Sequence, residues 1–280
     1  MAIRVAAEID AEIVSVDSMQ VYRGMDVGTA KPTVIERRGV THHMIDIVDP
    51  SVEYTVAEFR RRGKAVISSA DKPLIITGGS GLHFRSLVDP LSFAPTDPNV
   101  RSELESAPHD ELVSELLDSD PSAGLHVDLA NPRRVIRAVE ITRLSGETPS
   151  QRAASEEANA VRRYEAETEF TAIGVDPGEK LDERIDARLH QMREGGFVQE
   201  VRGLAGRLSR TAERAVGYRE VLSHLAGDLT EAEAFSQTAL NTKQLAKKQR
   251  TWFQRDPRIR WIPWSDDSDV RAERAIEELV

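Results

Sequence analysis

Residues 15–32 read S-V-D-S-M-Q-V-Y-R-G-M-D-V-G-T-A-K-P, and this stretch does most to decide the expected fold. It overlaps an apolar run at residues 13–16, whose length and β-branched side chains are typical of a buried strand. Asp17 follows that run directly, and hydroxyl, amide, phenol and guanidinium groups come after it, which suits no core segment. Because ligands of open α/β sheets bind beyond the carboxyl ends of the strands, we expect a ligand site here.

A second predicted strand ends in a similar way. Residues 74–77 (L-I-I-T) run into the turn 78–81 (G-G-S-G), and residues 82–87 then begin a helix. Helix N-termini bind anions and the Ser80 hydroxyl adds a donor, with a tight structural turn as the alternative. Further short apolar runs predict strands at residues 44–47, 170–175 and 259–262.

Helices are expected between these strands. Residues 2–9 and 56–70 carry apolar side chains at helical spacing, and alternation of strands with helices predicts an α/β fold with a parallel sheet. Several prolines then mark a change to a helical, acidic region without strands. We therefore expect an α/β core made of residues 1–96 and 167–280, with an all-helical insertion at residues 97–166.

Composition excludes several classes of protein. The net charge is −10, so nothing in the overall charge indicates a nucleic-acid binder. The chain has no cysteine, which excludes disulfides and thiolate zinc sites and favours a cytoplasmic location. No apolar run approaches the roughly 18 residues of a membrane helix, and no secretory signal is expected at the N-terminus.

The charge is nevertheless uneven along the chain. Residues 243–260 contain seven Lys or Arg residues and one acid, Asp256, and all three tryptophans lie in or beside this stretch. Basic residues interleaved with aromatic ones are typical of a nucleic-acid-binding surface. The alternative is a helix near the C-terminus whose apolar side packs on the protein and whose basic side is solvated.

Three groups of residues have side chains suited to chemistry. Asp17, at a strand end, suits a general base or a ligand of magnesium-bound water, or simply caps a turn. Two glycines beside Thr29 and Lys31 would let backbone and side-chain donors approach a phosphate, unless they form an ordinary turn. Arg214 and Arg219 offer planar forks for phosphate oxygens, with surface ion pairs as the alternative.

Taken in order, several segments resemble the tRNA dimethylallyltransferase family. They cover almost the whole chain. The matching segments are V-D-S-M-Q-V-Y-R-G-M-D-V-G-T-A-K-P, H-H-M-I-D-I-V-D-P, T-G-G-S-G-L-H-F-R, N-P-R-R-V-I-R-A-V-E, V-G-Y-R and Q-L-A-K-K-Q-R-T-W-F.

The resemblance implies a P-loop kinase-like α/β core with a helical insertion. It also implies transfer of a dimethylallyl group from dimethylallyl diphosphate to the exocyclic amine of the adenine 3′ of the anticodon, in tRNAs that read codons beginning with U. The implied partners are the tRNA anticodon stem-loop and dimethylallyl diphosphate, the implied cofactor is Mg²⁺, and no membrane is involved. We expect a monomer.

Site residues follow from the resemblance position by position. Asp17, Ser80 and Arg219 take the catalytic positions, and Arg214, Arg219 and Lys31 are expected to bind diphosphate. Ser80 stands where the family usually has threonine, and the hydroxyl is kept. The residues expected to contact tRNA are Asp17, Ser18, Met19, Gln20, Arg133, Arg134, Arg137, Lys243, Lys247, Lys248 and Arg250.

One family feature is absent from the sequence. The loop G-x-x-x-x-G-K-[ST] should precede Asp17 by roughly two dozen residues, and the sixteen residues before Asp17 contain no glycine. We therefore expect the first strand and the P-loop to be missing, so that this chain offers no metal ligand of its own and leaves a strand edge unpaired. Two alternatives are an inactive RNA-binding remnant and an adenylate isopentenyltransferase, although the basic segments argue against the second.

Overall fold

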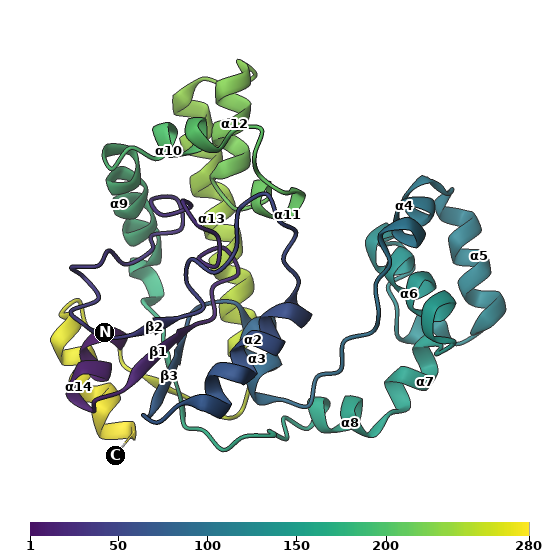
Figure 1. Cartoon of the computed structure of the whole chain (residues 1–280), viewed down its shortest axis with the longest axis horizontal. Helices are drawn as coiled ribbons and strands as arrows, with labels where there is room; N and C mark the ends of the chain where they lie inside the picture. Colours follow the sequence, from purple (N-terminus) through teal and green to yellow (C-terminus); the bar gives the residue numbers. More distant parts are fainter. Residues whose placement is uncertain (280) are drawn as a thin grey trace. The chain divides into compact units, whose positions relative to one another are not determined.

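The computed structural model describes residues 1–279 of the chain, which divides into two compact units (Figure 1). Unit 1 contains Met1–Leu87 and the chain from Phe170 onward, and unit 2 contains Val88–Glu169. The N- and C-terminal parts of the sequence therefore belong to one compact unit, and the middle part forms the other.

Unit 1 holds a three-stranded parallel sheet with the order β2-β1-β3. β1 (Glu12–Ser15) lies in the middle, β2 (His42–His43) pairs with it on one side, and β3 (Leu74–Thr77) on the other. Three of the four residues of β1 are buried, as its apolar composition requires. Ser15 faces Thr77 across the ladder, so β1 and β3 end side by side.

A second parallel pair, β4 (Ala172–Val175) with β5 (Ile259–Ile262), completes the strands. In residues 1–279, β3 pairs only with β1 and β4 only with β5, so each presents one edge without a strand partner. One apolar cluster nevertheless joins the two sheets, since side chains of β3, β4 and β5 pack with α1 (Ala2–Glu8) and α14 (Ser268–Leu279). α14 was not among the expected helices.

The predicted strand at residues 44–47 is wrong. Met44 and Asp46 adopt φ angles of 63° and 58°, which break an extended strand. The strand of this region is instead the short β2. The segment after it is held by two backbone hydrogen bonds, in which the N–H groups of Asp46 and Ile47 donate to the carbonyls of Gln20 and Val21.

Helices α2 (Val56–Ser69) and α3 (Gly81–Val88) pack closely in unit 1. Thr55 caps α2 by accepting the Glu58 N–H. A Cβ at Gly63 would lie 2.5 Å from Leu87, so the glycine is what permits this approach. Toward the C-terminus, unit 1 adds η2 (Gly178–Lys180), α9 (Leu181–Glu194), α10 (Phe197–Leu204), α11 (Arg210–Glu213), α12 (Tyr218–Ala226) and α13 (Glu231–Phe253).

Unit 2 is all-helical, with capping side chains at its helix starts. Asp97, Asn131, Thr148 and Ser155 each accept backbone N–H groups of the helix that follows. Its core is made of buried leucines, valines and alanines from the first helices. The elements are α4 (Pro98–Ser106), α5 (His109–Ser119), η1 (Ala123–Leu125), α6 (Pro132–Ser145), α7 (Pro149–Ala154) and α8 (Glu156–Arg162).

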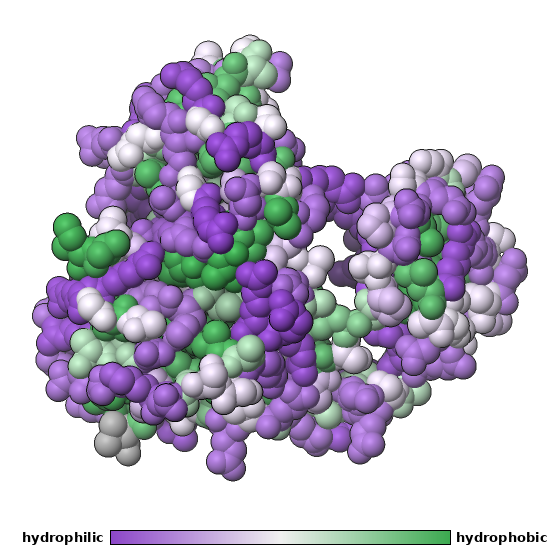
Figure 2. Space-filling model, viewed as in Figure 1, coloured by the Kyte–Doolittle hydropathy of each residue, from purple (hydrophilic) through white to green (hydrophobic). Residues whose placement is uncertain are grey.

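No helix within residues 1–279 combines the length and the apolar composition needed to cross a membrane. The face shown in Figure 2 is mostly hydrophilic, with apolar side chains confined to smaller patches.

Candidate functional site

The two predicted strand ends meet. Oδ1 of Asp17 accepts the backbone N–H of Met19 at 2.8 Å and that of Gln20 at 3.4 Å, which closes a tight turn after β1. The N–H of Ser18 donates to Oγ of Ser80 at 3.4 Å, so the G-G-S-G turn lies against this one. Within the described residues, Oδ2 of Asp17 accepts no hydrogen bond.

Two further side chains lie near the Asp17 carboxylate. Burial lowers the pKa of His83, and Asp17 opposes this by raising it, which leaves the imidazole neutral at neutral pH. Arg188 of α9 is exposed as a residue, but its guanidinium is partly enclosed, and burial lowers its pKa while Asp17 raises it. Sequence reasoning missed Arg188, because nothing in the pattern of α9 indicates which of its charged side chains reaches the site.

Gln20 supports the turn from inside the protein. Its Oε1 accepts the Ser15 hydroxyl at 3.0 Å, and its Nε2 donates to the Thr29 carbonyl at 3.2 Å. Arg188 donates to the same carbonyl at 3.4 Å. The Gln20 side chain is thus used for contacts within the protein.

The glycine-containing segment 24–31 receives an anion, but that anion is Glu200 of α10. Its Oε2 accepts the backbone N–H groups of Asp26 at 2.8 Å and Val27 at 2.7 Å, and its Oε1 accepts that of Gly28 at 3.1 Å. The hydroxyl of Tyr218 donates to Oε1 at 2.6 Å. An internal carboxylate therefore occupies the place where the sequence predicts a phosphate.

Lys31, which the sequence analysis expects at the diphosphate, is engaged within the protein. Its side chain is buried, and its Nζ donates to Asp26 at 2.5 Å, Asp46 at 2.6 Å and the carbonyl of Tyr22 at 2.8 Å. Because three acceptors already surround the ammonium group, Lys31 fixes the segment 24–31 and is not presented to a ligand.

The C-terminal half of α13 lies against the G-G-S-G turn. A Cβ at Gly79 would lie 2.5 Å from Nε2 of Gln249, and one at Gly81 would lie 2.1 Å from Nε1 of Trp252. The glycines permit this contact because they lack a side chain. The basic segment of α13 is thereby placed beside the ends of β1 and β3.

The basic side chains of α13 differ in what they contact. Lys243 pairs with Asp182 at 3.1 Å, and Arg250 pairs with Asp176 at 2.7 Å. Lys247 and Lys248 are exposed and make no ion pair within residues 1–279. Of the four basic residues of α13 that are expected to contact tRNA, these two are the cations without an ion pair in the described residues.

The two arginines expected at the diphosphate are both exposed. The side chain of Arg219 is 69% accessible, and its NH2 donates to the buried Glu220 at 3.2 Å. Arg214 lies at the end of α11, and its side chain makes no hydrogen bond or ion pair within the described residues. Tyr218, next to Arg219, packs on Gly28, where a Cβ would lie 2.6 Å from its ring. The V-G-Y-R segment therefore borders the segment 24–31.

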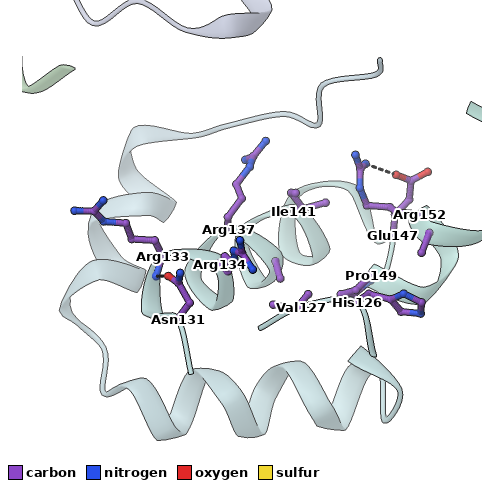
Figure 3. Close-up of a pocket in the computed structure, with 12 residues that line it drawn as sticks. His126, Val127, Asn131, Arg133, Arg134, Arg137, Ile141, Glu147, Pro149 and Arg152 are labelled. Atoms are coloured by element: carbon purple, nitrogen blue, oxygen red, sulfur yellow. Dashed lines mark hydrogen bonds and ion pairs between the residues drawn. The ribbon is translucent and has the colours of Figure 1, made fainter. Parts of the chain in front are cut away.

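Unit 2 contains a cavity of about 720 Å³, shown in Figure 3. Arg133 and Arg134 of α6 line it, both exposed, with Arg134 3.7 Å from Asp128. Arg152 also lines it and pairs with Glu147 at 3.0 Å. The rest of the wall is polar at His126, Asn131 and Arg137 and apolar at Val127, Ala138, Ile141, Pro149 and Ala153.

Arg137, which the sequence analysis expects to contact tRNA, makes several hydrogen bonds within unit 2. Its guanidinium donates to the carbonyls of Ala94 and Pro95, each at 2.8 Å, and to the buried Glu140 at 2.5 Å. Arg101 donates to the same carboxylate. Arg137 thus ties the segment before α4 to α6 while it lines the cavity, and Arg133 and Arg134 are more exposed.

The side chains present do not form a resident magnesium site. Within residues 1–279, no three His, Asp or Glu side chains are close enough together to hold a metal ion. Asp17 is a single carboxylate with one oxygen engaged in its turn. A magnesium site held by protein alone needs several oxygen ligands, which this single carboxylate does not supply.

Comparison with known proteins gives one consistent result. The family model described as IPP transferase matches residues 20–256. The tRNA dimethylallyltransferase of Corynebacterium diphtheriae is 40% identical, over 96% of this chain and 90% of the relative. That of Kineococcus radiotolerans is 42% identical, over 96% of this chain and 86% of the relative.

Solved structures agree. The full-length tRNA isopentenylpyrophosphate transferase of Bacillus halodurans superposes with a TM-score of 0.71 at 32% identity, covering 99% of this chain and 89% of that one. A eukaryotic dimethylallyltransferase acting on tRNA superposes with a TM-score of 0.77 over 97% of this chain and 73% of that one. At 24% identity, that second likeness concerns the fold alone.

Proposed function

The chain belongs to the IPP transferase family, and we propose that it transfers a dimethylallyl group from dimethylallyl diphosphate to the exocyclic amine of an adenine in tRNA. The target is the adenine on the 3′ side of the anticodon, in tRNAs that read codons beginning with U. The observation that carries the proposal is the placement of Asp17, with one oxygen fixed by its turn and the other unbonded, beside Ser18 and Ser80.

The proposed step follows from the chemistry of the amine. The lone pair of the adenine amine is delocalised into the ring, so the amine is a weak nucleophile. Asp17 would accept one of its protons while the nitrogen forms a bond to the allylic carbon and the bond from that carbon to diphosphate breaks. Ser18 and Met19 would border the base, which has to leave its stack to reach the site.

The leaving diphosphate needs positive charge and hydrogen-bond donors. Arg219 and Arg214 are proposed to supply the charge, and both are accessible. The Ser80 hydroxyl, which contacts the turn after Asp17, and the start of α3 would add donors. Mg²⁺ is the proposed cofactor and would supply further positive charge to the leaving group.

Two surfaces are proposed to bind the tRNA backbone. In unit 1, Lys247 and Lys248 of α13 are solvent-exposed beside a turn of the site. In unit 2, Arg133 and Arg134 line a cavity that mixes guanidinium groups with apolar wall, which suits an unpaired nucleotide. Lys243 and Arg250, with their ion pairs, would contribute less.

The finer description of the fold also stays a proposal. Parallel pairing of β1 with β3 and the glycine-rich turn before α3 support a P-loop kinase-like core. The 280 residues contain no G-x-x-x-x-G-K-[ST] sequence, so the diphosphate contacts proposed here use only the groups named above. A cytoplasmic monomer is proposed as well, in line with the absence of cysteine.

A competition assay tests the function. Labelled dimethylallyl diphosphate is supplied with equal amounts of AMP and of unmodified tRNA that reads codons beginning with U. We expect label in the tRNA only, because a free nucleotide offers no phosphate backbone for the two basic surfaces. Label in AMP would indicate an adenylate isopentenyltransferase, and tRNA binding without label would indicate an RNA-binding remnant.

A further inference from the structure

We infer that Glu200 is a positioning residue that couples the Asp17 side of the site to the Tyr218–Arg219 side. This inference rests on the proposed function. Glu200 is on α10, and its carboxylate contacts backbone and side-chain groups from both sides at once.

Glu200 first fixes the segment that follows the Asp17 turn. Three consecutive backbone N–H groups, those of Asp26, Val27 and Gly28, point at one carboxylate, an arrangement that favours an anion. Gly28 is required for it, because a Cβ there would lie 2.2 Å from the ring of Phe197. The segment therefore depends on a negative charge supplied from α10.

The segment 26–28 is linked to Asp17 by way of Gln20. The carbonyl of Thr29, one residue beyond Gly28, accepts from the Gln20 side chain at 3.2 Å and from Arg188 at 3.4 Å. The backbone N–H of Gln20 in turn donates to Oδ1 of Asp17. If the segment moves, Gln20, which helps to orient the Asp17 carboxylate, and the Arg188 cation near it should move too.

On the other side, the same carboxylate anchors the residue before Arg219. Tyr218 donates to Oε1 of Glu200, and the tyrosine is fully buried. Burial raises the pKa of Tyr218, and the charge of Glu200 raises it further, so the hydroxyl keeps its proton and remains a donor. Because Tyr218 precedes Arg219 directly, the backbone at Arg219 is thereby fixed in space relative to Gly28.

The coupling requires a carboxylate and not merely a polar side chain. Glu200 accepts four hydrogen bonds on two oxygens. Glutamine keeps the shape but has one acceptor oxygen, and its NH2 group would face either the Gly28 N–H or the N–H groups of Asp26 and Val27. Glu200→Gln should therefore loosen the segment without leaving a cavity.

The kinetic experiment compares Glu200→Gln with Tyr218→Phe and with the control Glu277→Gln, an exposed glutamate of α14. For Glu200→Gln we expect the single-turnover rate of transfer to fall about 10- to 100-fold and KM for dimethylallyl diphosphate to rise, because a small misplacement of reacting groups has effects of that order. Tyr218→Phe should mainly raise KM, and the control should match the wild type. A rate for Glu200→Gln within about twofold of wild type, or a loss fully explained by the unfolded fraction, would overturn the inference.

Hydrogen exchange of the free protein separates this inference from the proposed function. In Glu200→Gln, amide exchange should accelerate both at residues 26–28 and at residues 217–219, and in Tyr218→Phe mainly at the latter. Acceleration confined to residues 26–28 in Glu200→Gln would show that the carboxylate does not couple the two sides. If the wild type transfers nothing but exchange behaves as expected, the proposed function fails and the coupling stands.

Discussion

Ser18 and Ser80 are 62 positions apart in the chain, yet the backbone N–H of Ser18 donates to the hydroxyl oxygen of Ser80 at 3.4 Å. The contact follows from the parallel pairing of β1 with β3, which places Ser15 beside Thr77 and so brings the turns after both strands together. The turn that contains Asp17 and the Ser80 hydroxyl, just before the start of α3, in this way lie side by side.

Replacing Asp17 should separate its structural role from its chemical one. In Asp17→Asn the amide oxygen can still accept the Met19 N–H, so the turn should persist, but the side chain can no longer take a proton. We expect the transfer rate to fall about 10²- to 10⁴-fold while tRNA binding is retained. Single-turnover kinetics measure the transfer rate, and filter binding measures the affinity for tRNA. A transfer rate near that of the wild type would show that Asp17 does not take the proton.

The exposed lysines of α13 should govern the salt dependence of tRNA binding. Lys247→Ala combined with Lys248→Ala should weaken binding and lower the slope of log K against log salt by up to about 0.7–0.9 for each phosphate that is no longer neutralised. Lys72→Ala, which removes an exposed lysine paired with Asp10, serves as the control. An unchanged affinity and slope would mean that this face of α13 is only solvated.

Lys31 should matter for stability and not for diphosphate. Lys31→Met removes the partner of Asp26, Asp46 and the Tyr22 carbonyl. The free energy of unfolding, measured in urea, should therefore fall by about 2 kcal/mol. Isothermal titration should find the Kd for dimethylallyl diphosphate within about twofold of wild type in the folded protein. A large rise in Kd at unchanged stability would restore Lys31 to the diphosphate site.

The Glu140 cluster should make unit 2 sensitive to acid. Burial alone would raise the pKa of Glu140, but hydrogen bonds from Arg101 and Arg137 lower it below its ordinary value of 4.5. The pKa of Glu140 is lower in the folded state than in the unfolded state. The ionised carboxylate therefore stabilises the fold fully at pH values above the unfolded pKa, and this stabilisation is lost as the pH falls below about 4.5. Glu140→Gln should lower the free energy of unfolding by about 3 kcal/mol near neutral pH, and by less as the pH falls below about 4.5. Urea unfolding at a series of pH values measures this, and a cost that does not depend on pH would contradict it.

Local pattern was enough to find the strands that form the site. The strand predicted at residues 13–16 is β1 at Glu12–Ser15, and the one predicted at residues 74–77 is β3 itself. Both carry runs of branched apolar side chains ended by polar or glycine residues. The strand predicted at residues 44–47 fails because Met44 and Asp46 adopt left-handed backbone conformations, which these residue types do not signal.

Partners of charged side chains could not be predicted, because they come from packing between distant segments. Lys31 and Arg137 looked like accessible cations, yet each is neutralised by acceptors from other parts of its unit. Conversely, Glu200 and Arg188 lie on helices with many charged residues, and only the fold shows which of those reach the segment 24–31. The missing P-loop stays a prediction.

Prenylation of a single adenine of tRNA, with Asp17 taking the proton, can be followed at the level of individual nucleotides. Mass spectrometry of tRNA, after reaction with dimethylallyl diphosphate and either the wild type or Asp17→Asn, gives both the position and the extent of modification. We expect wild-type reactions to add one dimethylallyl group in place of one hydrogen, at the adenine 3′ of the anticodon only, and Asp17→Asn to add almost none. Modification elsewhere, equal modification by both proteins, or no modification by the wild type would show that the proposed reaction or the role of Asp17 is wrong.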